Sequence, residues 1–209
     1  MAQLALLSHT GVERADRSAQ LAVELFERRF PGQVRGYYLV GSYAVGEAIA
    51  SSDVDVVVLF KGAPSDADRE RFAETLQQCR AESPLPIDAT AIGEPRLREV
   101  GGVWFQSASR LLYGEDVRDA IPRKPAANHV RDTMHAVIPL LGRVRDNPEQ
   151  LHVPLDYPEP EGEFYGYDRR RMSLPDGTTC ASTKNVVLIA IGAANALTLL
   201  AAGQYLGTG

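Results

Sequence analysis

Two aspartates at the start of an apolar run are the residues in this chain best suited to metal chemistry. Asp53 and Asp55 lie two positions apart, and residues 54–60 are otherwise β-branched, aromatic or apolar, which predicts a strand covered on both faces. Side chains alternate along a strand, so both carboxylates should project to one side. Neighbouring carboxylates repel each other, and Mg²⁺ removes that repulsion by taking hard oxygen ligands. The pair by itself also suits two edge aspartates in solvent.

Donors for an anion precede the aspartates. Gly41 and Ser42 follow an apolar strand end at a tight turn, Gly46 permits a second bend, and Ser51 and Ser52 lead directly into the acidic pair. Glycine lets backbone N–H groups approach an anion closely, and the serines add hydroxyl donors. Anion donors and metal ligands therefore meet at one place, as binding of a triphosphate with its metal requires.

This composite pattern, an apolar residue with Gly41-Ser42, a short spacer, and Ser52-Asp53-Val54-Asp55 before more valines, resembles the signature of the polymerase-β-like nucleotidyltransferase superfamily. Within it, the stretch is similar to the adenylyltransferases that modify aminoglycoside antibiotics and to their small relatives. The likeness is clearest over about residues 20–120. It implies an α+β fold, with a nucleotidyltransferase-type mixed sheet and flanking helices, followed by a C-terminal helical domain.

The resemblance also implies an activity. AMP would pass from ATP to a hydroxyl of an acceptor such as an aminoglycoside-like small molecule. Gly41, Ser42 and Ser52 would hold the triphosphate, and Asp53 and Asp55 would bind Mg²⁺ as catalytic ligands. The choice of ATP over other nucleotides rests on the resemblance alone.

A further acid lies in the next expected strand, residues 87–92. Asp88 is unusual there because aspartate is depleted from strands, although an edge position in water would accommodate it. In the family a third carboxylate follows the helix after the paired aspartates, and Asp88 is the acid at the matching place. It is expected either as a metal ligand or as the base toward the acceptor hydroxyl. The antibiotic-modifying branch usually has a glutamate there.

The catalytic domain is expected to span residues 1–121. Helical spacing predicts helices over 12–29 and 65–82, the second with Ser65 as N-cap and Asp68 reaching back to it. Residues 34–40 predict a further strand. The segment 103–117 resembles the one that closes the domain in this branch, with a helix, a short edge strand and a turn. We interpret its Trp104 and Phe105 as core residues rather than an adenine platform.

A helical domain is expected over residues 122–209, with helices near 126–145 and 182–204 and a long loop at about 147–181. Acidic and aromatic residues in that loop either receive a cationic acceptor or form a solvated flexible segment. The last helix predicts a buried bundle helix rather than a membrane span, because it lacks flanking anchors. Lys184, in a Thr-Lys pair that matches the family, is either a phosphate contact or an exposed lysine.

The partners expected are a nucleotide and a small-molecule acceptor. The chain stops at Gly209, where this domain normally adds helices, so either it is truncated or a partner covers the last helix, for example as a homodimer. The net charge of −5 argues against nucleic acid. Cys79 and Cys180 suit thiols in a reducing cytosol, and no secretory signal begins the chain. The alternative function is a nucleotidyltransferase-fold antitoxin that binds or adenylylates a helical toxin.

Overall fold

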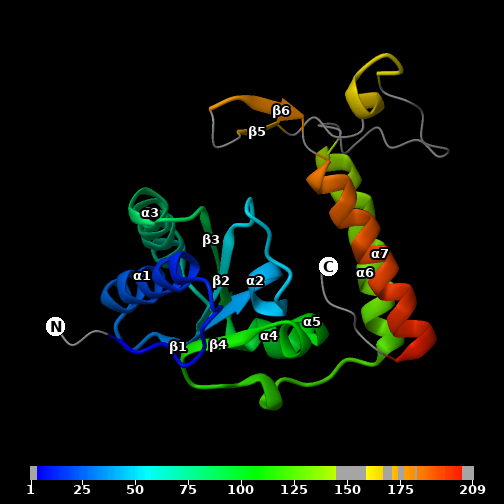
Figure 1. Cartoon of the computed structure of the whole chain (residues 1–209). Helices are drawn as coiled ribbons and strands as arrows, with labels where there is room; N and C mark the ends of the chain where they lie inside the picture. The colour runs from blue at the N-terminus through cyan, green and yellow to red at the C-terminus, as the bar shows by residue number, and fades with distance from the viewer. Residues whose placement is uncertain (1–3, 145–158, 167–170, 174–176, 182, 204–209) are drawn as a thin grey trace. The chain divides into compact units, whose positions relative to one another are not determined.

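The computed structural model describes residues 4–144, 159–166, 171–173, 177–181 and 183–203 (Figure 1). The chain forms two compact units, which divide between Lys124 and Pro125. The N-terminal unit carries the sheet, and the C-terminal unit, Pro125–Leu206, carries a pair of helices. Each unit is described by itself.

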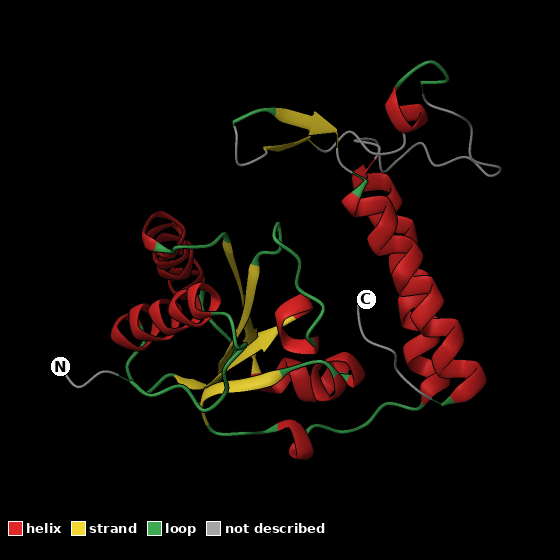
Figure 2. Cartoon of the chain, viewed as in Figure 1, coloured by secondary structure: helices red, strands yellow, loops and turns green. Residues whose placement is uncertain are grey.

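A four-stranded mixed sheet forms the centre of the N-terminal unit (Figure 2). Its strands are β1 (Val34–Val40), β2 (Val54–Phe60), β3 (Ile87–Gly93) and β4 (Arg110–Gly114), in the order β3-β2-β1-β4. β1 is antiparallel to β2 and β4, whereas β2 and β3 are parallel. The prediction of an α+β fold with a mixed sheet and flanking helices is therefore confirmed.

One face of the sheet packs against two long helices, α1 (Glu13–Arg29) and α3 (Asp66–Glu82). Val54, Val56 and Val58 of β2 contribute to this core, because alternate residues of a strand share a face. α3 begins with the expected capping box, in which Ser65 and Asp68 satisfy each other's backbone N–H groups. Both helices match the ranges that their apolar spacing predicts.

The other face packs against two short helices, α4 (Glu94–Val100) and α5 (Val103–Ser107). Phe105 is fully buried against Tyr38, with ring centroids 4.6 Å apart, and Trp104 packs at the border of the same cluster. The interpretation as core is confirmed for Phe105, whereas Trp104 is half-buried at the border of the cluster. Sequence analysis missed α4, because a single turn or two with one fully buried apolar residue shows no helical periodicity.

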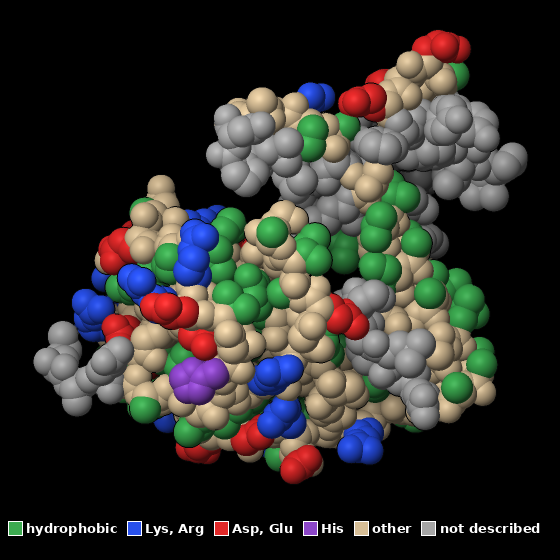
Figure 3. All heavy atoms as spheres, viewed as in Figure 1, with side chains coloured by type: hydrophobic (Ala, Val, Ile, Leu, Met, Phe, Trp, Pro, Cys, Tyr) green, Lys and Arg blue, Asp and Glu red, His purple; other side chains and the backbone are tan. Residues whose placement is uncertain are grey.

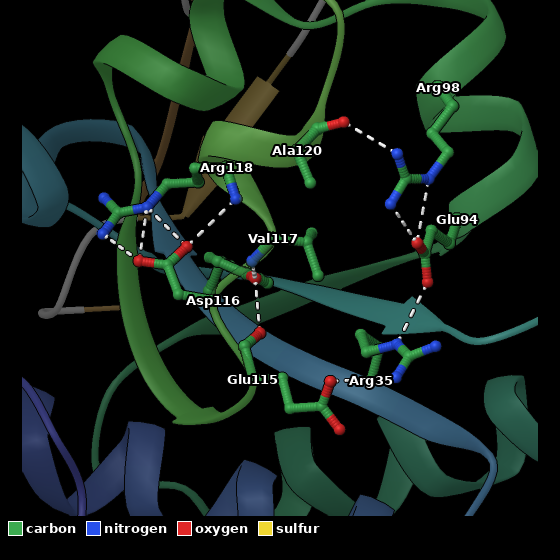
Figure 4. A network of polar contacts seen from close by, with 9 residues as sticks. Arg35, Glu94, Arg98, Glu115, Asp116, Val117, Arg118 and Ala120 are labelled. Carbon is green, nitrogen blue, oxygen red and sulfur yellow. Dashed lines mark hydrogen bonds and ion pairs between the residues drawn. The ribbon is translucent and has the colours of Figure 1, made fainter.

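An ion-pair network fastens the end of the sheet opposite to the aspartates (Figure 4). Arg35 Nε donates to Glu94 Oε2 at 3.0 Å and its Nη1 donates to Glu115 at 2.9 Å, while Arg98 Nη2 donates to Glu94 Oε1 at 2.7 Å. The hydrogen bonds from Arg98, and then from Arg35, lower the pKa of the buried Glu94 against the opposing effect of burial. The network therefore joins β1, α4 and the end of β4 around a carboxylate that stays charged.

The C-terminal unit contains α6 (Ala126–Val144) packed against α7 (Lys184–Ala202). None of the helices in the described part of the chain is long and apolar enough to span a bilayer. α7 is buried at Ala196 and Leu199 but exposed at Leu197 and Leu200, so part of its apolar surface is uncovered in the single chain, as expected for a bundle helix that lacks further cover. Hydrophobic side chains are visible along this helix pair in Figure 3.

The stretch expected as an irregular loop contains regular structure. β5 (Arg171–Ser173) and β6 (Thr179–Ala181) pair as a two-stranded antiparallel sheet, and a short 3₁₀ helix spans Glu163–Gly166. Strands of three residues are too short to show alternation, which is why the sequence pattern did not reveal them. Tyr157 and Tyr167, two of the aromatic residues of this expected loop, lie outside the described residues.

Two adjacent tyrosines of β1 point to opposite faces and differ in how their hydroxyls are satisfied. Tyr38 Oη donates to the Glu115 carbonyl at 2.8 Å and accepts from the Val117 N–H at 3.0 Å. Tyr37 Oη is buried and meets no partner at hydrogen-bond geometry among the described residues. Burial, and then the nearby negative charge of Glu27, raises the pKa of Tyr37, so this hydroxyl stays neutral.

This contrast predicts that the same substitution has different effects on stability at the two positions. Tyr38→Phe should lower the free energy of unfolding by about 1–3 kcal/mol, because it leaves the Val117 N–H and the Glu115 carbonyl without this hydrogen-bond partner. Tyr37→Phe should change it by less than about 1 kcal/mol or raise it, because it removes a buried hydroxyl that has no partner. Urea unfolding of the two variants measures both effects, and equal losses would contradict the assignment.

Candidate active site

The register of the central strands brings two of the three aspartates side by side. Asp55 lies opposite Val40, the last residue of β1, and is the register partner of Asp88 on the parallel strand β3. Register partners on neighbouring strands point to the same face and lie about 5 Å apart. Because Val54 and Val56 face α1 and α3, the Asp55 side chain faces the opposite side. Asp53 directly precedes β2 and is half-buried.

Gly41 lies close to the Asp55 carboxylate, whereas its approach to a phosphate stays a prediction. Its φ of +70° is left-handed, and a Cβ built there would overlap Asp55 Oδ2. Any other residue would therefore be strained and would also displace the acidic side chain. The backbone of Gly41 and the carboxylate of Asp55 thus form the best-defined contact of the candidate site.

The expected tight turn after β1 is a one-turn helix, α2 (Gly41–Val45), so that prediction was wrong in form. Tyr43 and Ala44 are buried in the α1–α3 core, which anchors the turn, and Gly46 ends it in a left-handed conformation. Ser42 is half-buried and its carbonyl accepts from the Glu47 N–H at 2.9 Å. Five residues are too few to show a helical period in sequence.

Ser52 braces the loop that leads into Asp53. Its Oγ accepts from the Ile49 N–H at 2.9 Å, and its own N–H donates to the Ile49 carbonyl at 2.9 Å. A hydroxyl that accepts one hydrogen bond still has its proton to donate. The role of Ser52 toward a phosphate stays a prediction, with the loop geometry as its structural support.

Asp88 lies on an edge strand, where an aspartate can reach water, and its carboxylate also pairs with an arginine. β3 is an outer strand, the Asp88 side chain is 52% exposed, and Oδ1 accepts from Arg80 Nη2 at 2.7 Å. Within the described residues, no three His, Cys, Asp or Glu side chains are grouped to hold a metal ion. The strand register therefore places Asp88 next to Asp55. The Asp88 carboxylate is nevertheless paired with the guanidinium of Arg80 and not with a metal-binding group of the described residues.

Sequence analysis missed Arg80, which lies in the last turn of α3 and carries no motif. Lys184 is the first residue of α7, in the C-terminal unit, and its contact with a phosphate stays a prediction. Two surface hollows lie away from the aspartates, one between α1 and α3 near Glu74 and one beside Lys61. Neither is lined by Asp53, Asp55 or Asp88, and we place the candidate site at the carboxylates because the predicted metal-binding and anion-binding groups lie there.

The donor set fits a magnesium ion. Asp53 and Asp55 offer carboxylate oxygens, the ligands that Mg²⁺ prefers, and the missing side chain of Gly41 gives the second carboxylate its place. These two residues would hold the ion together with oxygens of a bound triphosphate.

Comparison with known proteins agrees with this chemistry. Residues 21–94 match the family described as Nucleotidyltransferase domain, a stretch that holds β1, β2, β3 and all three aspartates. Residues 21–94 of this chain therefore form a nucleotidyltransferase domain. The resemblance inferred from the Gly41–Asp55 pattern is confirmed.

One solved structure shows the same fold, and a second has a weaker similarity. The chain is similar to spectinomycin adenyltransferase AAD(9) from Enterococcus faecialis with ATP and spectinomycin, at 16% identity and a TM-score of 0.51, over 62% of this chain and 68% of that one. It is also similar to a toxin-antitoxin structure with AMP-PNP, at 18% identity and a TM-score of 0.38, over 63% and 94%. Comparison with curated proteins gives no match.

The contact between Gly41 and Asp55 predicts the effect of one added methyl group. Gly41→Ala should destabilise the protein by roughly 1–2 kcal/mol, the cost of a left-handed alanine, and should weaken binding of ATP with Mg²⁺, because it displaces the Asp55 carboxylate. Gly32→Ala is the matched control, with φ +69° and nothing within 4 Å of the added Cβ. Urea unfolding and calorimetric ATP titration measure both. Equal ATP affinity in the two variants would contradict the contact.

Proposed function

We propose that this nucleotidyltransferase transfers AMP from ATP, with Mg²⁺, to a hydroxyl of an aminoglycoside-like small molecule. The observation that carries the proposal is the Asp55 carboxylate seated against the backbone of Gly41, with Asp53 directly before the same strand. This arrangement lies within a nucleotidyltransferase domain. The fold shared with a spectinomycin adenyltransferase crystallised with ATP supports the choice of nucleotide and acceptor class.

Each residue has a separate task in this proposal. Asp53 and Asp55 hold the ion, which when bound neutralises charge on the triphosphate oxygens. Gly41 offers its backbone and Ser42 and Ser52 offer hydroxyls to the triphosphate, at the turn and loop that flank the aspartates. Lys184 is proposed as a further phosphate contact.

Asp88 acts on the acceptor. The hydroxyl oxygen of the acceptor forms a bond to the α-phosphorus of ATP. The bond from that phosphorus to the α–β bridging oxygen breaks, so pyrophosphate leaves and AMP stays on the acceptor. The hydroxyl proton passes to the Asp88 carboxylate. One observation supports this role over metal ligation: the Asp88 carboxylate accepts a hydrogen bond from Arg80 and belongs to no three-ligand group of the described residues. Its register with Asp55 places it beside the proposed metal pair.

The direct test incubates the protein with ATP labelled at the α-phosphate, Mg²⁺, and a panel of aminoglycosides including spectinomycin. Pyrophosphate release and label on one small molecule are expected. Label on a protein from a cell extract, with none on the panel, would instead favour the antitoxin-type function toward a protein partner. Absence of transfer with both would contradict AMP transfer.

The carboxylates should give two distinguishable phenotypes. Asp53→Asn or Asp55→Asn should abolish transfer and the Mg²⁺ dependence of ATP binding while leaving the fold intact, because loss of carboxylate repulsion does not destabilise the free protein. Asp88→Asn should lower turnover by about 10²–10⁴-fold with ATP affinity unchanged, because a general base acts mainly in the transition state. Calorimetry with and without chelator, and pyrophosphate release, measure these effects. Wild-type values of both for Asp88→Asn would remove it from the site.

Pairing of two copies through α7 stays a proposal. Four apolar residues of that helix are exposed, namely Val187, Leu188, Leu197 and Leu200. Apolar surface of this kind favours association. Sedimentation velocity over a range of concentrations should show a dimer, and a monomer at every concentration would contradict it.

A further inference from the structure

Arg80 reaches from the end of α3 to the edge strand that carries Asp88. Its Nη2 donates to Asp88 Oδ1 at 2.7 Å, and its Nε lies 3.4 Å from the carbonyl oxygen of Ile87. The other two arginines of α3 behave differently: Arg69 pairs with Asp66 and Arg71 with Asp68, each within one turn of the same helix segment. Arg80 is thus the arginine of α3 whose described contacts are with the candidate site strand.

Hydrogen bonds hold the segments that carry Arg80 and Asp88, namely the end of α3 and the start of β3. Ser83 Oγ, just after α3, donates to Ser18 Oγ of α1 at 2.8 Å, and the Leu85 N–H donates to the same oxygen at 3.3 Å. The Val54 N–H then donates to the Pro86 carbonyl at 2.8 Å, which aligns the starts of β2 and β3. The end of α3, the loop and the start of β3 are therefore held together, so Arg80 and Asp88 are placed relative to each other by buried and backbone contacts.

We propose that Arg80 is a positioning residue for Asp88, which holds that carboxylate on the acceptor side and out of the metal pair formed by Asp53 and Asp55. This inference rests on the proposed function, because it assumes that Asp88 takes the acceptor proton.

The contacts explain how one guanidinium can do this. Arg80 Nη2 and the Ala89 N–H both donate to Oδ1 of Asp88, at 2.7 and 2.9 Å, which fixes the carboxylate orientation and leaves Oδ2 to receive a proton. Asp88 is also the register neighbour of Asp55, so two like charges would repel each other without a compensating cation. Arg80 supplies that positive charge from the outer side of the sheet. Without it, Asp88 is free to turn toward a cation at Asp53 and Asp55.

Both side chains of the Arg80–Asp88 pair are exposed, so Arg80 can be replaced with little effect on stability. The side chains of Arg80 and Asp88 are 56% and 52% exposed, so their ion pair contributes little to stability and Arg80→Gln should fold normally. Arg69→Gln is the matched control, because it removes another exposed pair of the same helix, at 3.7 Å, far along α3 from Asp88. Arg80→Lys keeps the charge without the planar fork of donors.

Turnover of the acceptor found in the transfer assay, or of water as acceptor in release of AMP and pyrophosphate, gives the first readout. Arg80→Gln should lower kcat by about tenfold or more with the KM for ATP within about twofold, because a misplaced catalytic group costs rate rather than nucleotide affinity. Arg80→Lys should recover part of the loss, and Arg69→Gln should match the wild type. In an Asp88→Asn background, Arg80→Gln should cause no further loss.

Two readouts do not depend on turnover. Mn²⁺ affinity, measured by calorimetry with ATP present, should be equal to or higher in Arg80→Gln than in the wild type, since Asp88 becomes free to join the metal. In the nucleotide-free protein, the NMR signal of the Arg80 Nε–H, identified by its loss in Arg80→Gln, should shift in Asp88→Asn. The Arg69 signal should not shift in that variant.

The outcomes separate this inference from the proposed function. If Asp88→Asn lowers turnover and Arg80→Gln matches Arg69→Gln, the positioning role is wrong and the proposed function stands. If Arg80→Gln lowers turnover equally in the Asp88→Asn background, Arg80 acts on something other than Asp88 and the inference is also overturned. If the Arg80 signal does not shift in Asp88→Asn, the ion pair is absent in solution, whatever the activity. If Asp88→Asn has wild-type turnover, the proposed role of Asp88 is wrong, and the inference about Arg80, which depends on that role, is wrong with it.

Discussion

The approach of the Asp55 carboxylate to the backbone of Gly41 depends on how β1 and β2 pair. The strands are antiparallel, with Val40 opposite Asp55, so the chain that leaves β1 at Gly41 turns directly over the second residue of β2. A shift of this register by one residue would turn Asp55 into the α1–α3 core and bring a valine to the site. The hydrophobic core on one face therefore fixes the position of the acid on the other.

The two faces of the sheet differ in role: one packs against the long helices, and the other carries the Asp55 side chain of the candidate site. Long helices cover one face completely with apolar contacts, whereas the other face is covered by α4 and α5 around Tyr38, Val57 and Leu59. The ion pairs of Arg35, Glu94 and Glu115 hold the end of the sheet away from the aspartates, where charge serves to join elements. At the opposite end, the aspartates lie on short strand ends with half-buried or exposed side chains, where ligands can reach them.

The sequence reveals this division well where elements are long. β1, β2, α1 and α3 follow from apolar runs or helical spacing, and Asp53 and Asp55 stand out because charged residues break an otherwise apolar strand. Three features could not be read in the same way. α2 and α4 are too short to show a period, and the β5–β6 hairpin has three-residue strands. The Arg80–Asp88 pair joins a helix end to a strand across a loop, so it depends on tertiary structure that no local pattern encodes.

That pair also shows why a weak interaction can matter for catalysis. An exposed ion pair contributes about 0–1 kcal/mol to the free energy of unfolding, because water and salt screen it. A tenfold change in rate corresponds to about 1.4 kcal/mol in the activation barrier, which is of the same order. Stability is shared among the many buried contacts of two core clusters, whereas the orientation of Asp88 rests on Arg80 and one backbone N–H. Loss of Arg80 therefore leaves the fold almost unchanged and acts on the one carboxylate whose direction the proposed transfer requires.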